Sequence, residues 1–448
     1  MASRDSKFIV FAHIGAQWAP CGQLTLTEEG PNLVASRFAY GLNYLKRNDA
    51  LEVDPVSLSI ADKAAVSGKY LLPVNALRFF GGIRDASPDS WGRRVIEAKL
   101  KVPPNSLPES QYLLHAGSER VGALDVRSGH HDAPTAGASS WHSLTHLMEA
   151  AERIEAGLPV PARLEAIFIE GTALGGARPK ASIRDEHGVL WLAKFGSRSD
   201  SFDIPAVESA ALQLAAQAGL TVPPVKTVTL GGRRVMLIRR FDRYWKASGA
   251  DGPPYAARLT VGPGDGRVEH RSAFASGLTL LGCDEMESRA KSYAELADAV
   301  RRYCHPSVIR ENNAELFKRM IYNIFVSNDD DHLRNHGFIW DDTLAGWRVS
   351  PLYDVLPRPS HAAERFLHLG IGKNGRLATL DNALSWHERF TLSQAAAAQS
   401  IADVWRVVRE WQVYFEEFGV DAAEIDAIAP AFRHIDQVST PELRRQLP

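Results

Sequence analysis

The chain has 448 residues, of which 45% are hydrophobic and 23% are charged, and its formal net charge is −2. This composition is typical of a soluble globular protein with two or three domains, and it excludes a general attraction to nucleic acid or to an anionic membrane. The cysteines are too few and too widely spaced for a disulfide framework or a structural zinc site: Cys21, Cys283 and Cys304. We find no signal-peptide pattern and no apolar run of ~20 residues, so we expect a cytoplasmic protein without a membrane partner.

The first part of the chain is predicted to be rich in β-structure. Short apolar runs predict strands at residues 8–11, 24–26 and 38–40. A helix is expected soon afterwards, with Asp85 or Ser87 as its N-cap. A Gly-, Ser- and His-rich stretch at residues 128–140 is the best domain boundary, and its histidine pair is more simply explained as exposed than as a metal site.

The remaining elements change gradually from strands to helices. A helix at 144–154 and a glycine-rich turn at 171–180 precede paired strands at 181–183 and 189–195, a helix at 207–218 and a hairpin at 225–238. The polar residues 242–271 are expected to form a flexible loop. Helical patterns dominate from residue 293, apart from strand-like segments at 337–340 and 347–349.

This order predicts an α+β fold with a protein-kinase-like core of two lobes. The N-lobe is rich in β-structure, the C-lobe is helical, and an extra β-rich subdomain precedes them. The predicted boundaries are 1–135 for the N-terminal subdomain, 136–240 for the ATP-gripping N-lobe and 241–448 for the catalytic C-lobe.

The densest group of reactive side chains lies at residues 327–335, which contain three carboxylates, two carboxamides, an imidazole and a guanidinium. Such a cluster is costly to fold unless a cation or a reaction occupies it. We assign Asp330 as the general base or hydroxyl-orienting acid, and Asn335 with the later Asp354 as Mg²⁺ ligands. His332 is expected to brace the loop by hydrogen bonds.

A second group of residues could grip phosphates. The glycine-rich turn could cradle them through backbone N–H groups and two cations, although a plain hairpin turn explains it at least as well: Gly175, Gly176, Ala177, Arg178, Pro179 and Lys180. Lys194 ends an apolar strand, and Glu208 in the next helix is a natural partner. The equal alternative is a lysine whose ammonium reaches solvent.

A rival interpretation is a metallohydrolase. His332 and His336 are four residues apart and, with Asp330 or Asp331, could bind Zn²⁺ or Fe²⁺. That interpretation leaves the glycine-rich turn, Lys194 and Asp354 without a role.

Taken together, these residues resemble a known family, the HipA-type serine/threonine kinases, which are the toxins of bacterial type II toxin–antitoxin pairs. The resemblance rests on five motifs in the family's order: Gly175–Lys180, the strand Lys194, Arg240-Phe241-Asp242-Arg243, Asn328-x-Asp330-x-His332-x-Arg334-Asn335 and Pro351-x-Tyr353-Asp354. The segment Pro88-Asp89-Ser90-Trp91-Gly92-Arg93 is similar to the family's N-terminal subdomain.

The resemblance implies a set of site residues. It makes Asp330 the catalytic aspartate, Asn335 and Asp354 the Mg²⁺ ligands, and Lys194 the lysine that contacts the ATP phosphates. The other residues implied to bind ATP are Gly175, Gly176, Ala177, Arg178, Pro179, Lys180, Arg239, Arg240, Phe241, His332, Arg334 and Tyr353. The family often has Glu where Arg239 stands, so the implied adenine contact there is through backbone.

A further departure concerns regulation. The family commonly carries an autophosphorylated serine just before the glycine pair, and the matching residue here is Ala173. The chain either lacks this switch or uses Thr172.

The resemblance also implies function and partners. It implies an ATP-dependent kinase toxin that phosphorylates a translation component such as an aminoacyl-tRNA synthetase. It further implies a HipB-like helix-turn-helix antitoxin, through which DNA is contacted indirectly. The alternatives are a non-catalytic kinase-fold module that binds the antitoxin at operator DNA, and phosphoryl transfer to a small molecule.

Overall fold

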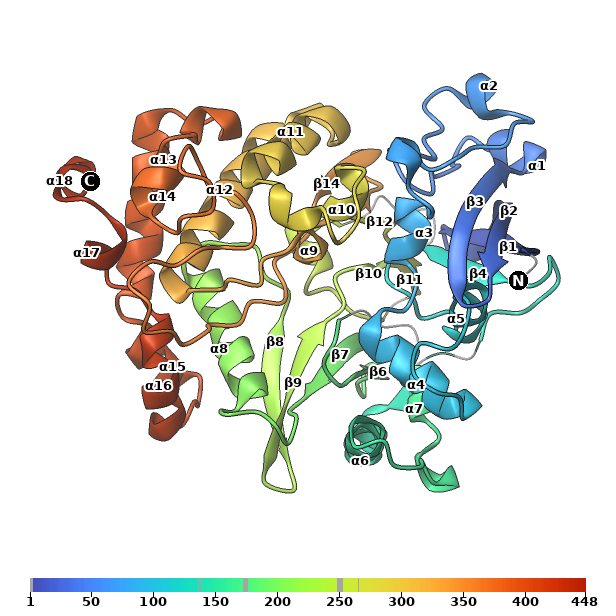
Figure 1. The fold of residues 1–448 in the computed structure, drawn as a ribbon, viewed down its shortest axis with the longest axis horizontal. Helices are drawn as coiled ribbons and strands as arrows, with labels where there is room; N and C mark the ends of the chain where they lie inside the picture. Colours follow the sequence, from blue (N-terminus) through green and yellow to red (C-terminus); the bar gives the residue numbers. More distant parts are fainter. Residues whose placement is uncertain (1–2, 136, 138, 172–175, 248–252, 265) are drawn as a thin grey trace. The chain divides into compact units, whose positions relative to one another are not determined.

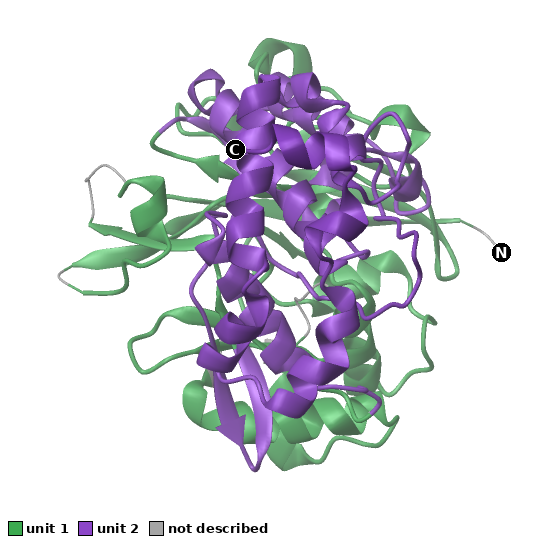
Figure 2. Cartoon of the chain, turned by 90° about the vertical axis from the view of Figure 1, so that its left-hand side faces the viewer, with its two compact units in different colours: residues 1–198, 237–275, 339–343 green, residues 199–236, 276–338, 344–448 purple. Residues whose placement is uncertain are grey.

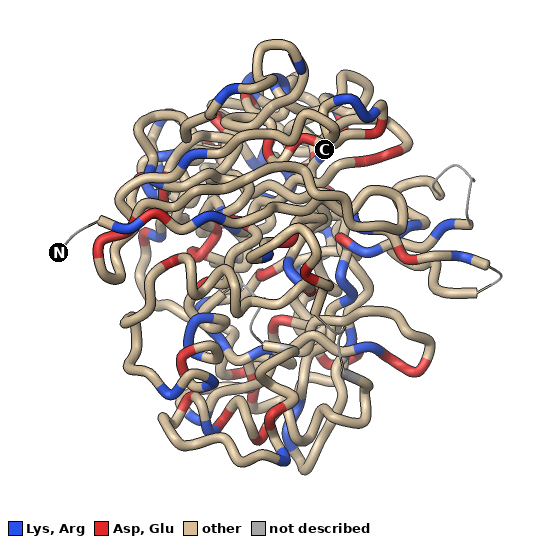
Figure 3. Tube along the Cα trace, turned by 90° about the vertical axis from the view of Figure 1, so that its right-hand side faces the viewer, with Lys and Arg blue, Asp and Glu red and all other residues tan. Residues whose placement is uncertain are grey.

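The computed structural model describes residues 3–135, 137, 139–171, 176–247, 253–264 and 266–448 (Figure 1). The chain divides into two compact units, which Figure 2 colours separately. Unit 1 contains residues 1–198, 237–275 and 339–343, and unit 2 contains residues 199–236, 276–338 and 344–448. Among the described residues, we find no helix long and apolar enough to cross a membrane. Figure 3 shows basic and acidic positions interspersed along the trace, in keeping with the small net charge.

Unit 1 begins with an antiparallel sheet whose strand order is β3-β2-β1-β4. Its strands are β1 (Arg4–Ile14), β2 (Gln17–Glu29), β3 (Asn32–Tyr40) and β4 (Leu124–Arg127). The central strands β1 and β2 have long buried runs, whereas exposed and buried residues alternate along the edge strand β3. Apolar side chains of these strands form one core with Tyr44, Ile83 and Leu113 from the neighbouring helices. The three strands predicted at the start of the chain are confirmed.

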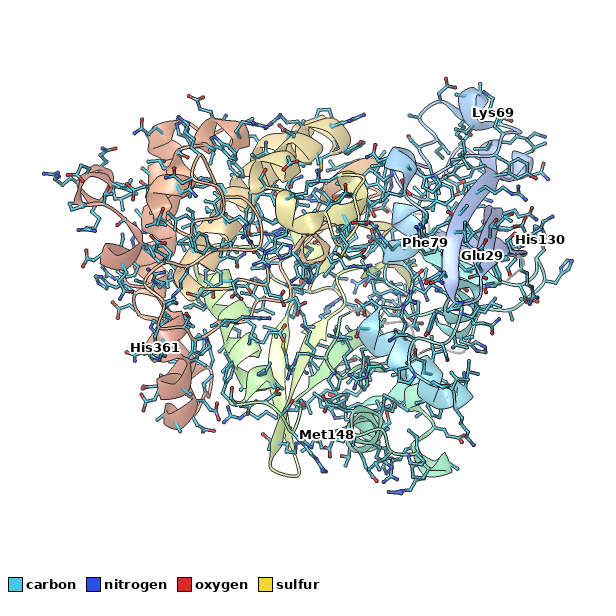
Figure 4. The ribbon with its side chains drawn as sticks, in the orientation of Figure 1. Glu29, Lys69, Phe79, His130, Met148 and His361 are labelled. Carbon is cyan, nitrogen blue, oxygen red and sulfur yellow. The ribbon has the colours of Figure 1, made fainter. Side chains whose placement is uncertain are left out.

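Short helices surround this sheet and lead to the second sheet of unit 1. They are α1 (Leu42–Leu45), α2 (Lys63–Val66), η1 (Val74–Ala76), α3 (Gly81–Asp85), α4 (Ser90–Leu100), α5 (Glu109–His115), η2 (Trp141–Ser143), α6 (Leu144–Glu155), η3 (Ala162–Leu164) and α7 (Ile167–Glu170). The predicted helix at 144–154 is confirmed as α6. The linker histidines His130 and His131 are exposed, and the side chain of His130 extends away from the strands (Figure 4).

The second sheet of unit 1 carries the predicted strand pair. β5 (Ser139–Ser140) lies beside β6 (Lys180–Arg184), which pairs antiparallel with β7 (Leu190–Phe195). The last residues of β9 (Arg233–Arg239) follow β7 in this sheet, and the first residues of β9 lie in unit 2 beside β8 (Val225–Leu230). The hairpin predicted at 225–238 is confirmed as β8 and β9.

The prediction of a structureless loop at 242–271 is wrong. An antiparallel pair, β10 (Arg243–Ala247) and β11 (Arg267–Arg271), occupies its two ends, and α9 (Tyr255–Arg258) lies between them. β12 (Phe274–Ser276) follows directly. The prediction failed because charged side chains are buried here as ion pairs, so the strands lack the apolar pattern by which strands are recognised.

Asp242 is the centre of this buried charge network. Its carboxylate accepts hydrogen bonds from Arg240 and Arg243, each at 2.6 Å, and from the Gly122 amide at 2.7 Å. Burial alone would raise the pKa of Asp242, but Arg240 and Arg243 outweigh it and hold the pKa well below its usual value. The carboxylate is therefore ionised, and it is a shared counter-charge for two buried guanidinium groups.

Unit 2 is mainly helical. Its long helices are α8 (Ile204–Gln217), α11 (Tyr293–Tyr303), α12 (Ile309–Val326) and α14 (Gln394–Val408). Its other elements are α10 (Gly277–Leu280), η4 (Ser288–Ala290), η5 (Pro306–Val308), η6 (Leu333–Asn335), β14 (Gly346–Val349), α13 (Leu380–Leu384), η7 (His387–Phe390), α15 (Trp411–Glu417), α16 (Ala422–Ile428), η8 (Ala429–Ala431), α17 (Ile435–Val438) and α18 (Pro441–Gln446). β13 (Gly337–Asp341) begins in this unit.

Local sequence explains where these helices start. Asp203 caps α8 through the Ala206 amide at 3.1 Å, and Ser292 caps α11 through the Glu295 amide at 3.2 Å. α12 packs against both α11 and α14, and its last turn leads into the acidic cluster (Figure 1). The predicted helices and the strands at 337–340 and 347–349 are confirmed, whereas the three domain boundaries stay a prediction.

Asp242→Ala should lower the free energy of unfolding by about 3 kcal/mol or more, because two buried guanidinium groups lose their counter-charge. Denaturant unfolding measures this loss. Asp5→Ala is the matched control, since Asp5 pairs with Arg37 at the surface, and it should cost about 1 kcal/mol or less. Equal losses in the two variants would contradict the role of the buried network.

Candidate functional site

The acidic cluster begins where α12 ends. Ser327 takes the left-handed conformation, with φ of 50°, and so ends the helix. The following Asn328 is buried, and its Nδ2 donates to Oδ1 of Asn323 in the helix at 3.1 Å. The turn is therefore fixed to the helix before the first aspartate is reached.

Asp330 presents its carboxylate at the surface of unit 2. Its side chain is 52% exposed and forms an ion pair with Arg358 at 2.8 Å, while Arg358 also contacts Asp329 at 3.2 Å. The backbone carbonyl of Asp330 is held from the other side, because it accepts from Asn335 Nδ2 at 2.8 Å and from the His332 amide at 2.9 Å. The backbone is thus fixed and the carboxylate can meet a substrate.

Asp331 points the opposite way, into the core of unit 2. Its carboxylate is 1% exposed and accepts from the Tyr293 hydroxyl at 2.5 Å and the His368 amide at 2.8 Å. Tyr293 accepts in turn from Asn323 Nδ2 at 2.9 Å. Burial raises the pKa of Asp331 to about 7, although the hydrogen bonds from Tyr293 and from the His368 backbone oppose that shift. Asp331 therefore ties the loop to α11, to α12 and to the segment at residue 368.

His332 supports the loop through its backbone rather than its ring. Its amide donates to Asp330, and its carbonyl accepts from the Asn335 amide at 2.8 Å. The ring lies edge-on to His368, with centroids 5.9 Å apart, and its buried Nδ1 has no hydrogen-bond partner among the described residues. His332 thus contributes backbone hydrogen bonds to the loop, as expected, whereas the side chain that braces the loop is that of Asp331.

The two proposed metal ligands lie in segments that touch each other. The Tyr353 hydroxyl, one residue before Asp354, donates to the Arg334 carbonyl, one residue before Asn335, at 2.7 Å. Asp354 has φ of 59°, a conformation uncommon for residues with a side chain. The Arg334 side chain turns toward Glu285, with Nε 3.0 Å from the carboxylate.

The donor set fits Mg²⁺ better than Zn²⁺. Asn335 uses its Nδ2 to hold Asp330, which leaves an amide oxygen that can act with the Asp354 carboxylate as a hard ligand. Across the described part of the chain, no three residues among His, Cys, Asp and Glu are grouped as a metal site would require. Burial also lowers the pKa of His336 to about 3, and its Nε2 faces the Asp331 carbonyl at 3.3 Å. The metallohydrolase interpretation gains no support.

The phosphate-gripping residues lie in unit 1. Lys180 on β6 and Lys194 on β7 are direct cross-strand partners, and both are buried, at 6% and 8% exposure. Side chains at paired positions project from the same face of a sheet, so the two ammonium groups belong to one face. Two cations on one face could contact neighbouring oxygens of a polyphosphate.

The glycine-rich turn is described only in part. Gly175 lies outside the described residues, as do Thr172 and Ala173. Gly176 has φ of +86°, and a Cβ there would collide with the Lys180 ammonium, so this position needs glycine. Of the others, Ala177 is exposed, Arg178 is half-buried and Pro179 is buried.

The residues expected near adenine use their side chains elsewhere. Arg239 donates to backbone carbonyls, including that of Arg258 at 3.5 Å, and Arg240 belongs to the Asp242 network. The Phe241 ring lies 6.3 Å from Phe274 in a tilted arrangement. Because these side chains are engaged elsewhere, a contact with adenine at residues 239–241 would have to be made by backbone atoms.

Lys194 and its predicted partner Glu208 are both buried, at 8% and 3% exposure. They belong to different units, so their pairing stays a prediction. Sequence reasoning missed Asp331, Arg358, Asp89 and Trp91. Only Asp89 carried a local signal, because it stands where a helix is normally capped.

Comparisons with known proteins identify the fold and the family of the chain. A solved structure titled as the Toxin Antitoxin System HipA, HipB and operator DNA complex of Shewanella oneidensis MR-1 matches with a TM-score of 0.61 and 15% identity, over 98% of this chain and 96% of that one. The chain therefore has the mixed α+β fold in which a β-sheet subdomain precedes a kinase-like region.

Two curated proteins are also similar in sequence. "Putative kinase Y4mE" of Sinorhizobium fredii is 27% identical over 360 residues, which are 77% of each chain. "Putative kinase" of Haemophilus influenzae is 24% identical over 199 residues, which are 42% of this chain and 53% of that one. The model of the family described as the HipA-like C-terminal domain matches residues 172–411, and the chain belongs to this family.

The stability of the chain should depend on pH through Asp331. The folded state raises the pKa of Asp331 from its usual 3.8 to about 7, so it binds an extra proton between these values and loses stability as pH rises through them. Asp331→Asn cannot titrate here. Its free energy of unfolding relative to the original chain should therefore rise by roughly 4 kcal/mol between pH 4 and pH 8.

Denaturant unfolding at several pH values measures this difference. Tyr293→Phe should move the midpoint of the change to higher pH, because it removes the hydroxyl that stabilises the carboxylate. A difference between the Asn variant and the original chain that does not vary from pH 4 to pH 8 would contradict the assignment.

Proposed function

We propose that the chain is an ATP-dependent serine/threonine protein kinase that acts as the toxin of a bacterial toxin–antitoxin pair. The observation that carries the proposal is the arrangement around Asp330. The exposed carboxylate of Asp330 stands on a fixed loop, and the segments that carry the two proposed oxygen ligands are joined by a hydrogen bond between neighbouring residues. Phosphoryl transfer needs such an arrangement together with cations for the phosphates, and Lys180 and Lys194 supply these.

The proposal assigns each of these residues a role in phosphoryl transfer. Asp330 would accept the proton of the attacking hydroxyl through its carboxylate, because its backbone is held and its side chain faces solvent. Asn335 and Asp354 would hold Mg²⁺, and Lys180 and Lys194 would bind phosphate oxygens. When bound, Mg²⁺-ATP supplies the phosphoryl group and neutralises its charge. Arg358 donates to one oxygen of the Asp330 carboxylate, Oδ2, at 2.8 Å.

We extend the proposal to partners on the basis of the similarity to the Shewanella HipA structure. The Shewanella HipA structure contains HipB and operator DNA, which supports a HipB-like helix-turn-helix antitoxin here and an indirect contact with DNA. A translation component such as an aminoacyl-tRNA synthetase is the proposed substrate, and the cytoplasm is the proposed location.

The autophosphorylation switch is proposed to be absent or to use Thr172, since Ala173 has no hydroxyl. Phosphopeptide mapping after incubation with Mg²⁺-ATP tests this choice. Phosphate on Thr172 would establish the second option, and its absence from Thr172 and all neighbours would leave the first.

A second candidate is a non-catalytic module that binds an antitoxin at operator DNA. The composition of the Shewanella complex favours it, because the HipA chain there is part of a DNA-bound assembly. The retention of Lys194, Asp330, Asn335 and Asp354 favours a catalytic protein instead.

Asp330→Ala should reduce transfer of the γ-phosphate of ATP to protein substrate by about 10²-fold to 10⁴-fold, because the general base is lost. Radiolabel transfer to a bacterial lysate, or to the chain itself, measures this loss. Asp329→Ala is the matched control, since Asp329 is adjacent, similarly exposed and paired with the same arginine.

The control should keep its activity within a few-fold of the original chain. Equal labelling by the original chain and by Asp330→Ala would contradict a catalytic role for Asp330. Growth arrest on expression that is relieved by Asp330→Ala but not by Asp329→Ala would show that toxicity depends on catalysis.

A further inference from the structure

Helix α4 supports the described residues on both sides of the glycine-rich turn. The Trp91 amide donates to the Gly176 carbonyl at 3.0 Å, and its indole Nε1 donates to the Lys180 carbonyl at 2.8 Å. At the other end of the turn, a Cβ on Gly171 would lie 3.2 Å from Cγ2 of Val95. All of these residues belong to unit 1, and the helix comes from a segment about 80 residues earlier in the chain.

Asp89 completes the contact. It occupies the N-cap position of α4, yet its side chain makes no capping hydrogen bond to its own helix. Its carboxylate instead accepts from the Gly176 amide in a short hydrogen bond. The N–H and the C=O of Gly176 are therefore both held by the start of α4. The expectation that Asp85 or Ser87 caps this helix is wrong, because α3 ends at Asp85 and α4 begins at Ser90.

The helix is a rigid base for this contact. Trp91, Val95 and Ile96 have no exposed surface. On the outer side, Arg93 forms an ion pair with Glu109 of α5 at 2.5 Å, and its guanidinium lies 4.3 Å from the Tyr112 ring centre. A displacement of the first turn of α4 would disturb all of these contacts, so Gly176 is held by a part of the chain that does not move easily.

The contact between α4 and Gly176 also affects the position of Lys180, a cation of the proposed ATP site. The Lys180 ammonium lies against Gly176, close to where the Cβ of another residue would stand. The Lys180 carbonyl is fixed by the Trp91 indole, and Lys180 faces Lys194 across the sheet. The orientation of α4 thus sets both the backbone at Gly176 and the position of one of the paired lysines.

We propose that Asp89 and Trp91 are positioning residues for nucleotide binding, through which the segment preceding the kinase-like region holds Gly176 and the backbone of Lys180 in place. The inference rests on the proposed function and deepens it, because it gives a role to a motif outside the residues that would touch ATP. Loss of either contact frees Gly176 and Lys180 to adopt other conformations, and binding of the phosphates must then order them again.

Calorimetric titration of the full chain with Mg²⁺-ATP tests the proposal, in an Asp330→Ala background that prevents turnover. Asp89→Ala should weaken binding about tenfold, since a charged hydrogen bond contributes roughly this much. Asp89→Asn keeps an acceptor oxygen and should recover most of the affinity. Trp91→Phe keeps the ring but loses the indole donor and should show an intermediate loss.

Asp62→Ala is the matched control. Asp62 also precedes a helix of unit 1, but it caps that helix conventionally, accepting from Ala64 and Ala65 at 3.0 Å each. This variant should bind Mg²⁺-ATP as the parent chain does. With Asp330 intact, Asp89→Ala should raise the KM for ATP about tenfold and leave kcat at saturating ATP within about twofold.

Hydrogen exchange at the Gly176 amide gives a readout that needs no nucleotide. Exchange should be faster in Asp89→Ala than in the parent chain and unchanged in Asp62→Ala. Unchanged or tighter Mg²⁺-ATP binding by Asp89→Ala would overturn the positioning role, as would unchanged exchange at Gly176. If the parent chain bound no nucleotide, the proposed function would fail, and altered Gly176 exchange would then reveal a purely structural contact.

Discussion

The buried carboxylate of Asp331 is the interaction on which the candidate site of unit 2 depends. A carboxylate with 1% exposure is costly, and it is tolerated because Tyr293 and the His368 amide both donate to it. These bonds bring together the start of α11, the last turns of α12 and a segment almost forty residues later in the chain. Because Asp331 points inward, its neighbour Asp330 must point outward, which gives the proposed base its exposure.

Unit 1 also buries charged side chains near the proposed site, but there the charges are positive. Lys180 and Lys194 are buried and directly paired across two strands of one sheet. Gly176 lies against Lys180, and this glycine is held by hydrogen bonds from a separate helix. Each unit therefore has charged side chains at which we propose that a phosphate or a metal ion binds, and in each unit hydrogen bonds fix the nearby backbone.

Sequence predicted the parts of this account that depend on local pattern. Periodicity located three of the four strands of the first sheet, the β6–β7 pair and the long helices, and the motif residues Asp330, Asn335 and Asp354 stood out by chemistry and spacing. The β10–β11 pair was missed because its few buried residues, Arg243, Tyr244 and His270, include two polar ones and form no apolar alternation. Asp331 was indistinguishable from Asp329 because its partners, Tyr293 and His368, are 38 and 37 residues away.

The central proposal is that Lys180 and Lys194 bind the phosphates of ATP and that Asn335 and Asp354 bind Mg²⁺. A crystal structure of the chain with Mg²⁺ and a non-hydrolysable ATP analogue tests it most directly. The account predicts phosphate oxygens within hydrogen-bond distance of the Lys180 and Lys194 ammonium groups, and Mg²⁺ bound by the Asn335 amide oxygen and the Asp354 carboxylate at about 2.1 Å. A nucleotide bound elsewhere, or a metal ion held without Asp354, would contradict it.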